Sequence, residues 1–404
     1  MTKTIILLGA GGECVPIIQK AKDMGLRTVV VDGCGSAPGM ALADVPVVAS
    51  CYHADAALQG LRRSPIKGAD GVMCAATDSP HVAAAIREEF GLPGLSVASA
   101  RLSIDKGDQK AVLRTFGIPV PDSTGRNPLK PSIQSDWVIK PADSRGGRGV
   151  IRLAGVDYEW AYKTARALSP TGQVVIERWL DGPQYSTESI ILGGRVMFTV
   201  CGLRNYDRLA EFAPYSIEDG FDVPSIPPCG IGAVNELIAR ACVALGWLDT
   251  APGLTVKGDL IWHDDRLVIL ELAARLSGGY FCSHVTPMAY GIDFVYAAIK
   301  LALGEGLEWR VGGGAIAPFG AGFVSQRYVF SDPADIGRTV VSLPRVSDWA
   351  AWATWLIKPG DIIKPVTSHA ARLGQACCIA GTMADAEHMA ARAVAEMKAG
   401  ASLE

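Results

Sequence analysis

The first hundred residues alternate short apolar runs with amphipathic stretches, and this alternation constrains the fold more than any other feature. The stretch 80–91 has helical spacing and ends at a glycine. Strands that alternate with helices pair in parallel, because each crossover helix returns the chain to the same end of the sheet. Residues 1–100 are therefore predicted to form an α/β domain in which helices cover both faces of a parallel sheet. The apolar runs predicted as its strands are 4–10, 28–33, 45–50 and 71–76.

The turn after the first predicted strand partly resembles a dinucleotide-binding fingerprint. Gly9, Gly11 and Gly12 stand where this strand meets the first helix, and Asp32 lies near the end of the second strand. Such a turn brings the backbone close to a phosphate at a helix N-terminus. The last glycine of the fingerprint is missing, because Cys14 stands in its place. We therefore interpret the turn as a tight strand–helix connection and not as an NAD(P) or FAD site.

Length, charge and cysteine pattern limit the classes of protein to which the chain can belong. With 404 residues, two or three domains are expected. Lys and Arg number 38 against 41 Asp and Glu, so there is no basic excess to neutralise a nucleic acid. Apolar runs stay short of the roughly 18 residues of a membrane span, and the ten cysteines include no CxxC pair. We therefore expect a cytoplasmic protein with reduced thiols and with neither nucleic-acid nor membrane partners.

The pattern changes at about residue 101, where strands and helices no longer alternate. Residues 101–117 are predicted to form one helix that ends at a glycine, and a strand–loop–strand unit follows around 136–153. A hairpin is expected at 258–271 and leads into a Gly-Gly loop. Short strands and then a long helix occupy the last part of the chain. The sequence thus predicts an α+β unit over 101–310 and a C-terminal α/β segment over 311–404.

A lysine and a glycine-rich loop form the first candidate site. Lys140 lies near the end of a predicted strand, and the loop 143–149 that follows holds two arginines and three glycines. Exposed backbone N–H groups and fixed guanidinium charges suit a polyphosphate. The loop is not a Walker A sequence, because no GxxxxGK[ST] occurs in the chain. On these residues alone, an ordinary surface turn is the alternative.

Two acidic residues on the predicted hairpin form the second candidate site. Asp259 and Glu271 would lie near the same end of two antiparallel strands, within reach of one ion. Carboxylates on rigid strands suit Mg²⁺ and leave room for phosphate oxygens. Arg275 follows Glu271 by four residues and would stabilise negative charge during phosphoryl transfer. Two solvated acids and a surface arginine are the alternative here.

Taken in order, these segments resemble the ATP-grasp superfamily, and its carboxylate–amine ligase branch most of all. The resemblance extends over nearly the whole chain. It implies an N-terminal parallel-sheet domain, a two-part nucleotide clamp, a small C-terminal domain that closes the site, and ATP with Mg²⁺ as cofactors. The segments that carry it are SIDKGDQK, VIKPADSRGGRGV, VIERWLDGPQYSTESI and GDLIWHDDRLVILELAARLSGG.

The resemblance assigns roles to individual residues. Two lysines match those that contact the ATP phosphates, the glycine loop matches a lid over the triphosphate, a hinge segment matches the adenine site, and one acid is similar in position to a ribose-side acid. Asp259 and Glu271 match the magnesium ligands, and Arg275 matches the arginine that steadies an acyl phosphate. The residues implied for the nucleotide are Lys106 and Lys140, then Ser144, Arg145, Gly146 and Gly147, then Glu177, Arg178, Trp179 and Leu180, and finally Glu188.

Two departures from the family pattern concern the metal site. Ala273 stands where the family often has an asparagine ligand, and Asp259 stands where glutamate is common. Fewer or shorter ligands leave the number of magnesium ions open between one and two.

The activity implied by the resemblance is an ADP-forming carbon–nitrogen ligase. The γ-phosphoryl group of ATP passes to a small carboxylate, such as an amino acid, and an amine then displaces phosphate. Lid closure keeps water away from the acyl phosphate. Arg275, Lys140 and Arg204 are the predicted catalytic residues. The predicted substrate contacts are Arg204, Lys257, Ser277, Gly278 and Gly279, with Tyr206 nearby. A structural salt bridge is the alternative for Arg204.

Two other functions stay open. A purine-pathway-like carboxylase or formate-dependent transferase on a phosphoribosyl substrate also suits the N-terminal half, and a non-enzymatic nucleotide-binding protein is the third interpretation. His369 and Arg372 would close the site from the C-terminal segment, with a structural histidine as the alternative for His369. Homodimers are common among such ligases, although no residue here points to one.

Overall fold

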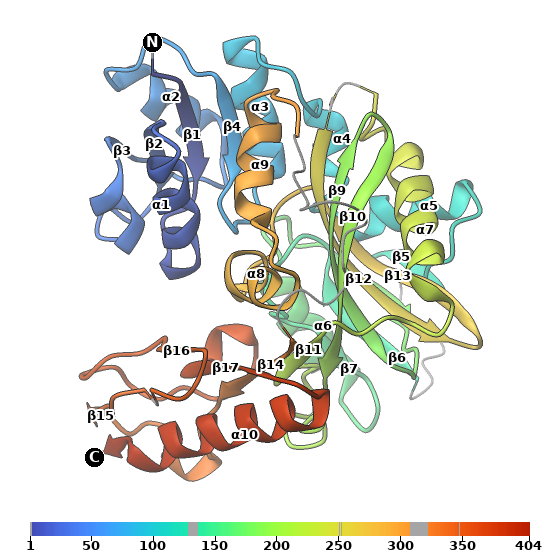
Figure 1. Cartoon of the computed structure of the whole chain (residues 1–404). Helices are drawn as coiled ribbons and strands as arrows, with labels where there is room; N and C mark the ends of the chain where they lie inside the picture. Colours follow the sequence, from blue (N-terminus) through green and yellow to red (C-terminus); the bar gives the residue numbers. More distant parts are fainter. Residues whose placement is uncertain (1, 128–135, 250, 252, 308–321, 347) are drawn as a thin grey trace.

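A computed structural model describes residues 2–127, 136–249, 251, 253–307, 322–346 and 348–404. The described strands form four sheets. Figure 1 shows the N-terminal sheet with its helices at one end, a long central sheet through the middle, and helix α10 along the C-terminal strands. The predicted mixture of a parallel N-terminal sheet with an α+β remainder is confirmed.

The N-terminal sheet is parallel, as predicted, with strand order β3-β2-β1-β4. Alternate residues of β1 enter two different hydrophobic clusters: Ile5 and Leu7 pack in one, and Ile6 and Leu8 in the other. Both faces of the sheet are therefore covered, as in other parallel sheets. The elements are β1 (Thr4–Leu8), α1 (Val15–Asp23), β2 (Arg27–Asp32), β3 (Val45–Val48), α2 (Ala54–Arg63), β4 (Gly71–Cys74), α3 (Pro80–Phe90) and α4 (Val97–Arg101).

The turn after β1 is held by local contacts. The Asp32 carboxylate accepts the backbone N–H groups of Ala10 and Cys34, each at 2.8 Å. Gly9 has a φ of +101°, and a Cβ there would lie 2.2 Å from Cγ2 of Thr77. Only glycine meets both conditions. These contacts account for the glycine and the aspartate as parts of a tight strand–helix connection.

A small antiparallel sheet of order β5-β8-β6-β7 follows. The helix predicted over 101–117 begins later than expected, at Lys106, because the Asp105 side chain accepts the N–H of Asp108 and caps the helix there. The predicted end at Gly117 is close, since α5 stops at Thr115 and Gly117 has a φ of +66°. The elements are α5 (Lys106–Thr115), β5 (Ser123–Arg126), β6 (Trp137–Pro141), β7 (Ile151–Arg152), α6 (Tyr158–Ala167) and β8 (Val174–Arg178).

The central sheet has eight antiparallel strands in the order β13-β12-β9-β10-β11-β14-β17-β16. Its C-terminal strands join through β11, which pairs with β14. The sequence did not indicate that this last segment continues the same sheet. The elements are β9 (Gln184–Leu192), β10 (Arg195–Asn205), β11 (Gly220–Val223), α7 (Gly230–Ala244), β12 (Gly253–His263), β13 (Arg266–Ala273), β14 (Phe323–Val329), β16 (Trp352–Trp355), β17 (Gly374–Ala380) and α10 (Met383–Gly400).

The remaining described elements are α8 (Thr286–Tyr290), α9 (Phe294–Ala302), and the two-stranded sheet of β15 (Val340–Ser342) with β18 (Ser402–Leu403). The division into 1–100, 101–310 and 311–404 stays a prediction. Its second boundary, and the start of the strand expected from 315, lie in 308–321, outside the described residues.

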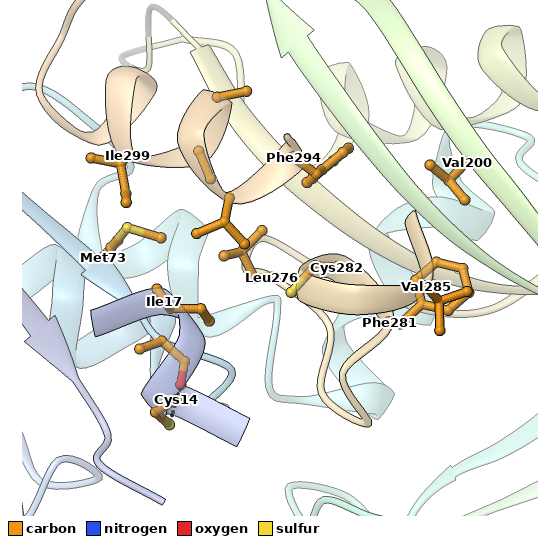
Figure 2. Close-up of a cluster of buried hydrophobic side chains, with 14 of the residues drawn as sticks. Cys14, Ile17, Met73, Val200, Leu276, Phe281, Cys282, Val285, Phe294 and Ile299 are labelled. Carbon is orange, nitrogen blue, oxygen red and sulfur yellow. Dashed lines mark hydrogen bonds between the residues drawn. The ribbon is translucent and has the colours of Figure 1, made fainter. Parts of the chain in front are cut away.

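A hydrophobic cluster joins the N-terminal sheet to the central sheet (Figure 2). Cys14 and Ile17 lie at the start of α1, Phe294 and Ile299 belong to α9, and Val200 comes from β10. Between them lies the segment that follows β13, with Leu276, Phe281, Cys282 and Val285 in the same cluster. The glycines at 278 and 279 therefore belong to a segment that buried side chains anchor on both sides in sequence, at Leu276 and Phe281.

Candidate active site

A cleft of about 600 Å³ lies where all parts of the chain meet. Its walls come from the ends of β1 and β4, the small sheet, the central sheet and the C-terminal segment. That volume is in the range of small-molecule sites. The cleft gathers nearly the whole set of predicted site residues: Lys106, Lys140, Ser144, Arg145, Gly146, Gly147, Glu177, Arg178, Trp179, Leu180, Arg204, Lys257, Asp259, Glu271, Arg275, Ser277, Gly278 and Gly279.

The two predicted metal acids are directly opposite each other on β12 and β13. Burial opposes ionisation of Glu271, but nearby lysine charges, that of Lys106 first, lower its pKa to about 2. Asp259 pairs with Lys257 and lies 3.3 Å from Nη1 of Arg204. Two carboxylates on rigid neighbouring strands fit a hard cation such as Mg²⁺. Within the described ranges no three His, Cys, Asp or Glu side chains form a group that could hold a metal ion.

Of the two predicted phosphate lysines, Lys106 contacts one of these acids and Lys140 contacts Glu177. Nζ of Lys106 is 3.3 Å from Glu271 and donates to the carbonyl of Ser144 at 2.8 Å. Nζ of Lys140 lies 2.5 Å from Glu177. Lys106 thus contacts both an acid and the glycine loop, and Lys140 contacts an acid. Both ammonium groups lie in the cleft that this loop also lines.

Lys110 is a buried lysine that sequence reasoning missed. Its Nζ is 2.7 Å from Glu177, whose side chain is only 1% exposed. Burial lowers the pKa of Lys110 to about 8 despite the neighbouring carboxylate. Its position four residues after Lys106, on the same face of one helix, was the available signal. Glu177 is therefore shared by two lysines, Lys110 and Lys140, and its predicted contact with adenine stays a prediction.

The glycine loop contacts residues from both the N-terminal and the C-terminal parts of the chain. Gly146, Gly147 and Gly149 have φ values of +62°, +69° and +70°, which glycine tolerates best. The guanidinium of Arg145 lies over the ring of Tyr52, 3.7 Å from its centroid. The N–H of His369 donates to the carbonyl of Gly146 at 3.0 Å. Burial, followed by the charge of Arg372, lowers the pKa of His369 to about 3, so its ring is neutral at pH 7.

A chain of ion pairs crosses the inner end of the cleft. Arg204 pairs with Glu218 and with Asp259, and Nη2 of Arg372 lies 2.9 Å from Glu218. Burial opposes ionisation of Glu218, but the charges of Arg204, His369 and Arg372 hold its pKa well below its usual range. Tyr206 donates to Gln184 at 3.1 Å. Glu218 precedes β11 in a segment without a motif, and sequence reasoning missed it.

Arg275 is oriented by an aspartate, Asp78, from the parallel-sheet part of the chain. Its Nη2 and Nε lie 2.5 and 2.6 Å from Oδ1 of Asp78, and its Nη1 donates to the carbonyl of Leu276. Asp78 follows β4 and Glu13 follows β1, and both line the cleft. The carboxyl ends of parallel strands are where ligands of such sheets bind. That rule was the signal that could have identified Asp78 and Glu13.

Glu188 lies on β9 and contacts the segment that follows β13. Its side chain is fully buried and lies off the cleft, and its carboxylate accepts the N–H and the hydroxyl of Ser277. The segment after β13 turns back over β9 and covers it. Burial raises the pKa of Glu188 to about 7. The residue therefore holds Ser277 in place, and its predicted contact with the ribose stays a prediction.

Two expectations from composition can be compared with the structure. The ten cysteines, all within the described ranges, are free thiols, and eight are buried. Among the helices of the described residues, none combines the length and the apolar composition needed to cross a membrane.

Comparisons with known sequences agree with this geometry. Residues 129–310 match the family model described as carbamoyl-phosphate synthase L chain, ATP binding domain. The chain is 26% identical over 341 residues to the uncharacterized protein y4rH of Sinorhizobium fredii, across 80% of this chain and 66% of that one. It is 26% identical over 224 residues to D-alanine–D-alanine ligase B of Pseudomonas putida, across 47% and 65%. The aligned regions span just under two thirds of both relatives.

Another relative and two solved structures extend the likeness. The formate-dependent phosphoribosylglycinamide formyltransferase of Nitratidesulfovibrio vulgaris is 26% identical over 294 residues, across 66% of this chain and 71% of the relative. The L-amino acid ligase of Bacillus licheniformis superposes with a TM-score of 0.77 at 18% identity, across 100% and 98%. The biotin carboxylase domain dimer of Hydrogenobacter thermophilus 2-oxoglutarate carboxylase, solved with MgADP and bicarbonate, gives 0.68 at 16%, across 100% and 91%. At these identities the structures establish a shared fold.

Proposed function

Because the chain belongs to the ATP-grasp superfamily, we propose that it is an ADP-forming ligase that joins a small carboxylate to an amine. The observation that carries the proposal is the arrangement of one cleft. Paired acids and lysines lie at one end, Arg275 lies beside them, and arginines without a nucleotide role lie at the other end. ATP with Mg²⁺, the cofactors predicted from the sequence, are those of the superfamily.

The nucleotide occupies the end of the cleft between the two antiparallel sheets. Lys106 and Lys140 bind the phosphates, and the loop from Ser144 to Gly147 covers them with backbone N–H groups and the Arg145 side chain. The hinge segment Glu177–Leu180 lines the same end and holds the adenine. The bond of Lys106 to the carbonyl of Ser144 supports this assignment, because it ties a phosphate lysine to the loop.

Asp259 and Glu271 hold the metal in this proposal. Mg²⁺ bound there supplies charge neutralisation for the phosphate oxygens. The low pKa of Glu271 supports the assignment, because a ligand must be ionised at neutral pH. Ala273 lies beside them without a ligand atom, so the number of ions, one or two, stays a prediction.

The chemistry proposed for the cleft has two steps. The carboxylate attacks the γ-phosphorus and ADP leaves, and the amine then attacks the acyl carbon and phosphate leaves. Arg275 stabilises the negative charge on the phosphoryl and acyl oxygens, and Asp78 fixes the direction of its guanidinium. Arg204, Lys257 and the Ser277–Gly279 segment position the carboxylate. The glycine loop excludes water while the acyl phosphate waits for the amine.

A phosphoribosyl substrate is the second candidate. The formyltransferase relative aligns over a larger share of its length than the D-alanine ligase does, and Arg372 places a C-terminal guanidinium on the cleft. A carboxylase or formate-dependent transferase would use the same nucleotide end. The two candidates differ in whether the inner end of the cleft takes a small acid or a phosphate ester.

The test is ADP release from MgATP with a panel of amino acids, small carboxylates and phosphoribosyl amines, each with a range of amines. ADP that forms only when one acid and one amine are both present supports the ligase. ADP that forms with a phosphoribosyl compound and bicarbonate or formate supports the second candidate. ATP binding without turnover of any pair would contradict both.

The metal assignment has its own variant and control. Glu271→Gln keeps the shape of the side chain but removes its charge, and we expect ADP release to fall at least about 100-fold. The control is Asp264→Asn, at the exposed tip of the same hairpin, where φ is +48° and asparagine is tolerated. Equal activity of the two variants would refute the metal assignment.

A homodimer is also proposed, because homodimers are common among such ligases, and analytical ultracentrifugation tests it.

A further inference from the structure

Two buried polar atoms at the inner end of the cleft have no hydrogen-bond partner among the residues that the structure describes. They are Oη of Tyr328 and Nε of Arg372. Tyr328 is 3% exposed and Arg372 is 9% exposed, and both side chains line the cleft. Buried donors are nearly always paired in native proteins, because an unpaired one loses its hydration without compensation. Two such donors on the wall of one cleft indicate a place for a ligand acceptor.

Oη of Tyr328 and a second nitrogen of Arg372, Nη1, lie close to one spot, the α-carbon of Gly279. The guanidinium of Arg372 stacks on the ring of Tyr328, 3.6 Å from its centroid. A Cβ on Gly279 would lie 3.1 Å from Oη of Tyr328 and 3.9 Å from Nη1 of Arg372. The missing side chain of Gly279 therefore keeps open the space that both residues face. We call Tyr328, Arg372 and Gly279 the inner socket.

The charge around the inner socket suits one negative charge and not two. Along the chain of ion pairs, three cations (Lys257, Arg204 and Arg372) face two carboxylates (Asp259 and Glu218), which leaves a surplus of one positive charge. Glu13 lies on the other side of the glycine pair, where a Cβ on Gly278 would meet its Oε2 at 2.6 Å. After burial, the charges of Glu218 and Glu13 contribute to the raised pKa of the Tyr328 phenol, so both acids act on the socket. A phosphate dianion would face these two acids, whereas a carboxylate matches two donors and one charge.

The inner socket is also separate from the reacting end. Two charged residues, Arg204 and Glu218, stand in series between the metal acid Asp259 and Arg372. An anion in the socket is therefore a different group from the carboxylate that Arg275 and the metal acids activate.

We propose that the inner socket binds a free carboxylate of one of the two substrates, a carboxylate that is not phosphorylated during the reaction. This inference rests on the proposed ligase function and narrows its substrates to bifunctional acids or to amines that carry a carboxylate, such as amino acids. It selects against phosphoribosyl compounds at this end of the cleft. The acid and the amine are the two sources of the carboxylate, and kinetics distinguishes them.

The first test is Tyr328→Phe, which removes only the hydroxyl. Because that hydroxyl has no hydrogen-bond partner in the part of the chain that the structure describes, we expect a melting temperature equal to or above that of the wild type. We expect KM to rise about tenfold for the substrate that carries the carboxylate, with kcat nearly unchanged, because a hydrogen bond to a charged group is lost. The substrate whose KM rises, acid or amine, is the source. Tyr296→Phe, an exposed tyrosine on α9, is the matched control.

The second test compares each active substrate with its carboxamide analogue. In the wild type the analogue should lose about 10- to 100-fold in kcat/KM, and in Tyr328→Phe most of that loss should disappear, since the contact is already gone. Arg372→Lys keeps a charge for Glu218 but loses the planar fork, and it should behave in the same direction. An unchanged analogue penalty in both variants would overturn the proposal while leaving the ligase intact.

If no pair of acid and amine releases ADP, the proposed function is contradicted. A binding measurement then still tests the inner socket. The probes are succinate and inorganic phosphate, added to the full chain with Mg²⁺ and ADP, with the thermal shift as readout. Stabilisation by succinate that exceeds that by phosphate and is lost in Tyr328→Phe supports the socket. Stabilisation that is the same in the variant, absent, or greater with phosphate overturns it.

Discussion

The buried group of Lys110, Lys140 and Glu177 allows an asymmetric prediction about stability. Glu177 is the acid that both lysines contact at 2.7 and 2.5 Å, and it is 1% exposed. Glu177→Gln leaves two buried ammonium groups facing a neutral amide. Breaking a buried ion pair by removal of one partner costs about 3–5 kcal/mol. We expect the low end, about 3 kcal/mol, because Glu271 also interacts with both lysines.

Substitution of Lys110 should reduce stability much less than substitution of Glu177. Burial lowers its pKa from 10.5 to about 8, a difference that corresponds to about 3 kcal/mol against the charged form. Lys110→Met removes that cost, and Lys140 still pairs with Glu177. We therefore expect a change in stability below about 1 kcal/mol. The loss of stability in Glu177→Gln should thus exceed that in Lys110→Met by at least about 2 kcal/mol. This difference corresponds to about 30-fold in the equilibrium constant for local opening.

Hydrogen–deuterium exchange with mass spectrometry is the assay, because it reports local opening in a chain of several domains. The peptides to follow contain β6 (Trp137–Pro141) and β8 (Val174–Arg178), since Lys140 and Glu177 lie on these strands. Exchange there should be about 100-fold faster in Glu177→Gln and nearly unchanged in Lys110→Met. Equal exchange in the two variants would show that the buried lysine is not held at a cost, and the reasoning would fail.

Two further predictions concern Glu188 and the glycine loop. The folded pKa of Glu188, about 7, lies above its ordinary value of 4.5, so the folded protein binds more protons than the unfolded chain between these values and loses stability as pH rises from 4.5 to 7. Glu188→Gln should therefore melt higher than the wild type at pH 8, by up to about 3 kcal/mol in stability, and the gain should vanish at pH 4; a gain independent of pH would contradict this. Tyr52→Leu removes the ring under Arg145 and should raise KM for ATP about three- to tenfold without changing the melting temperature by more than a few degrees, whereas Tyr162→Leu, on α6, should leave KM unchanged.

The relative positions of site residues could be predicted where the residues lie close together in the sequence. Asp259 and Glu271 face each other because a hairpin pairs residues near in sequence, and Asp264 and Asp265 form its turn. The resemblance also predicted Lys106 and Lys140 as site residues, and both line the same cleft as these acids. The roles of these residues stay predictions, although their placement in one cleft agrees with them.

The parts that sequence reasoning missed depend on contacts between distant segments. Asp78 and Arg275 are 197 residues apart, and Arg372 and Glu218 are 154 apart, so no periodicity relates them. Glu188 illustrates a different limit. Strand alternation gives the face on which a side chain lies but not what later covers that face, and here the segment with Ser277 covers it.

The pairing of β11 with β14 has a consequence for how this chain can be re-engineered. Removal of the residues after about 320 would uncover the N–H and C=O groups along one side of β11, which are an open template for aggregation. It would also delete Tyr328 and Arg372 from the cleft. An exchange of substrate preference with a relative by swapping the C-terminal segment would therefore have to carry β14, β16 and β17 across as one block, in the register Phe221 to Gln326.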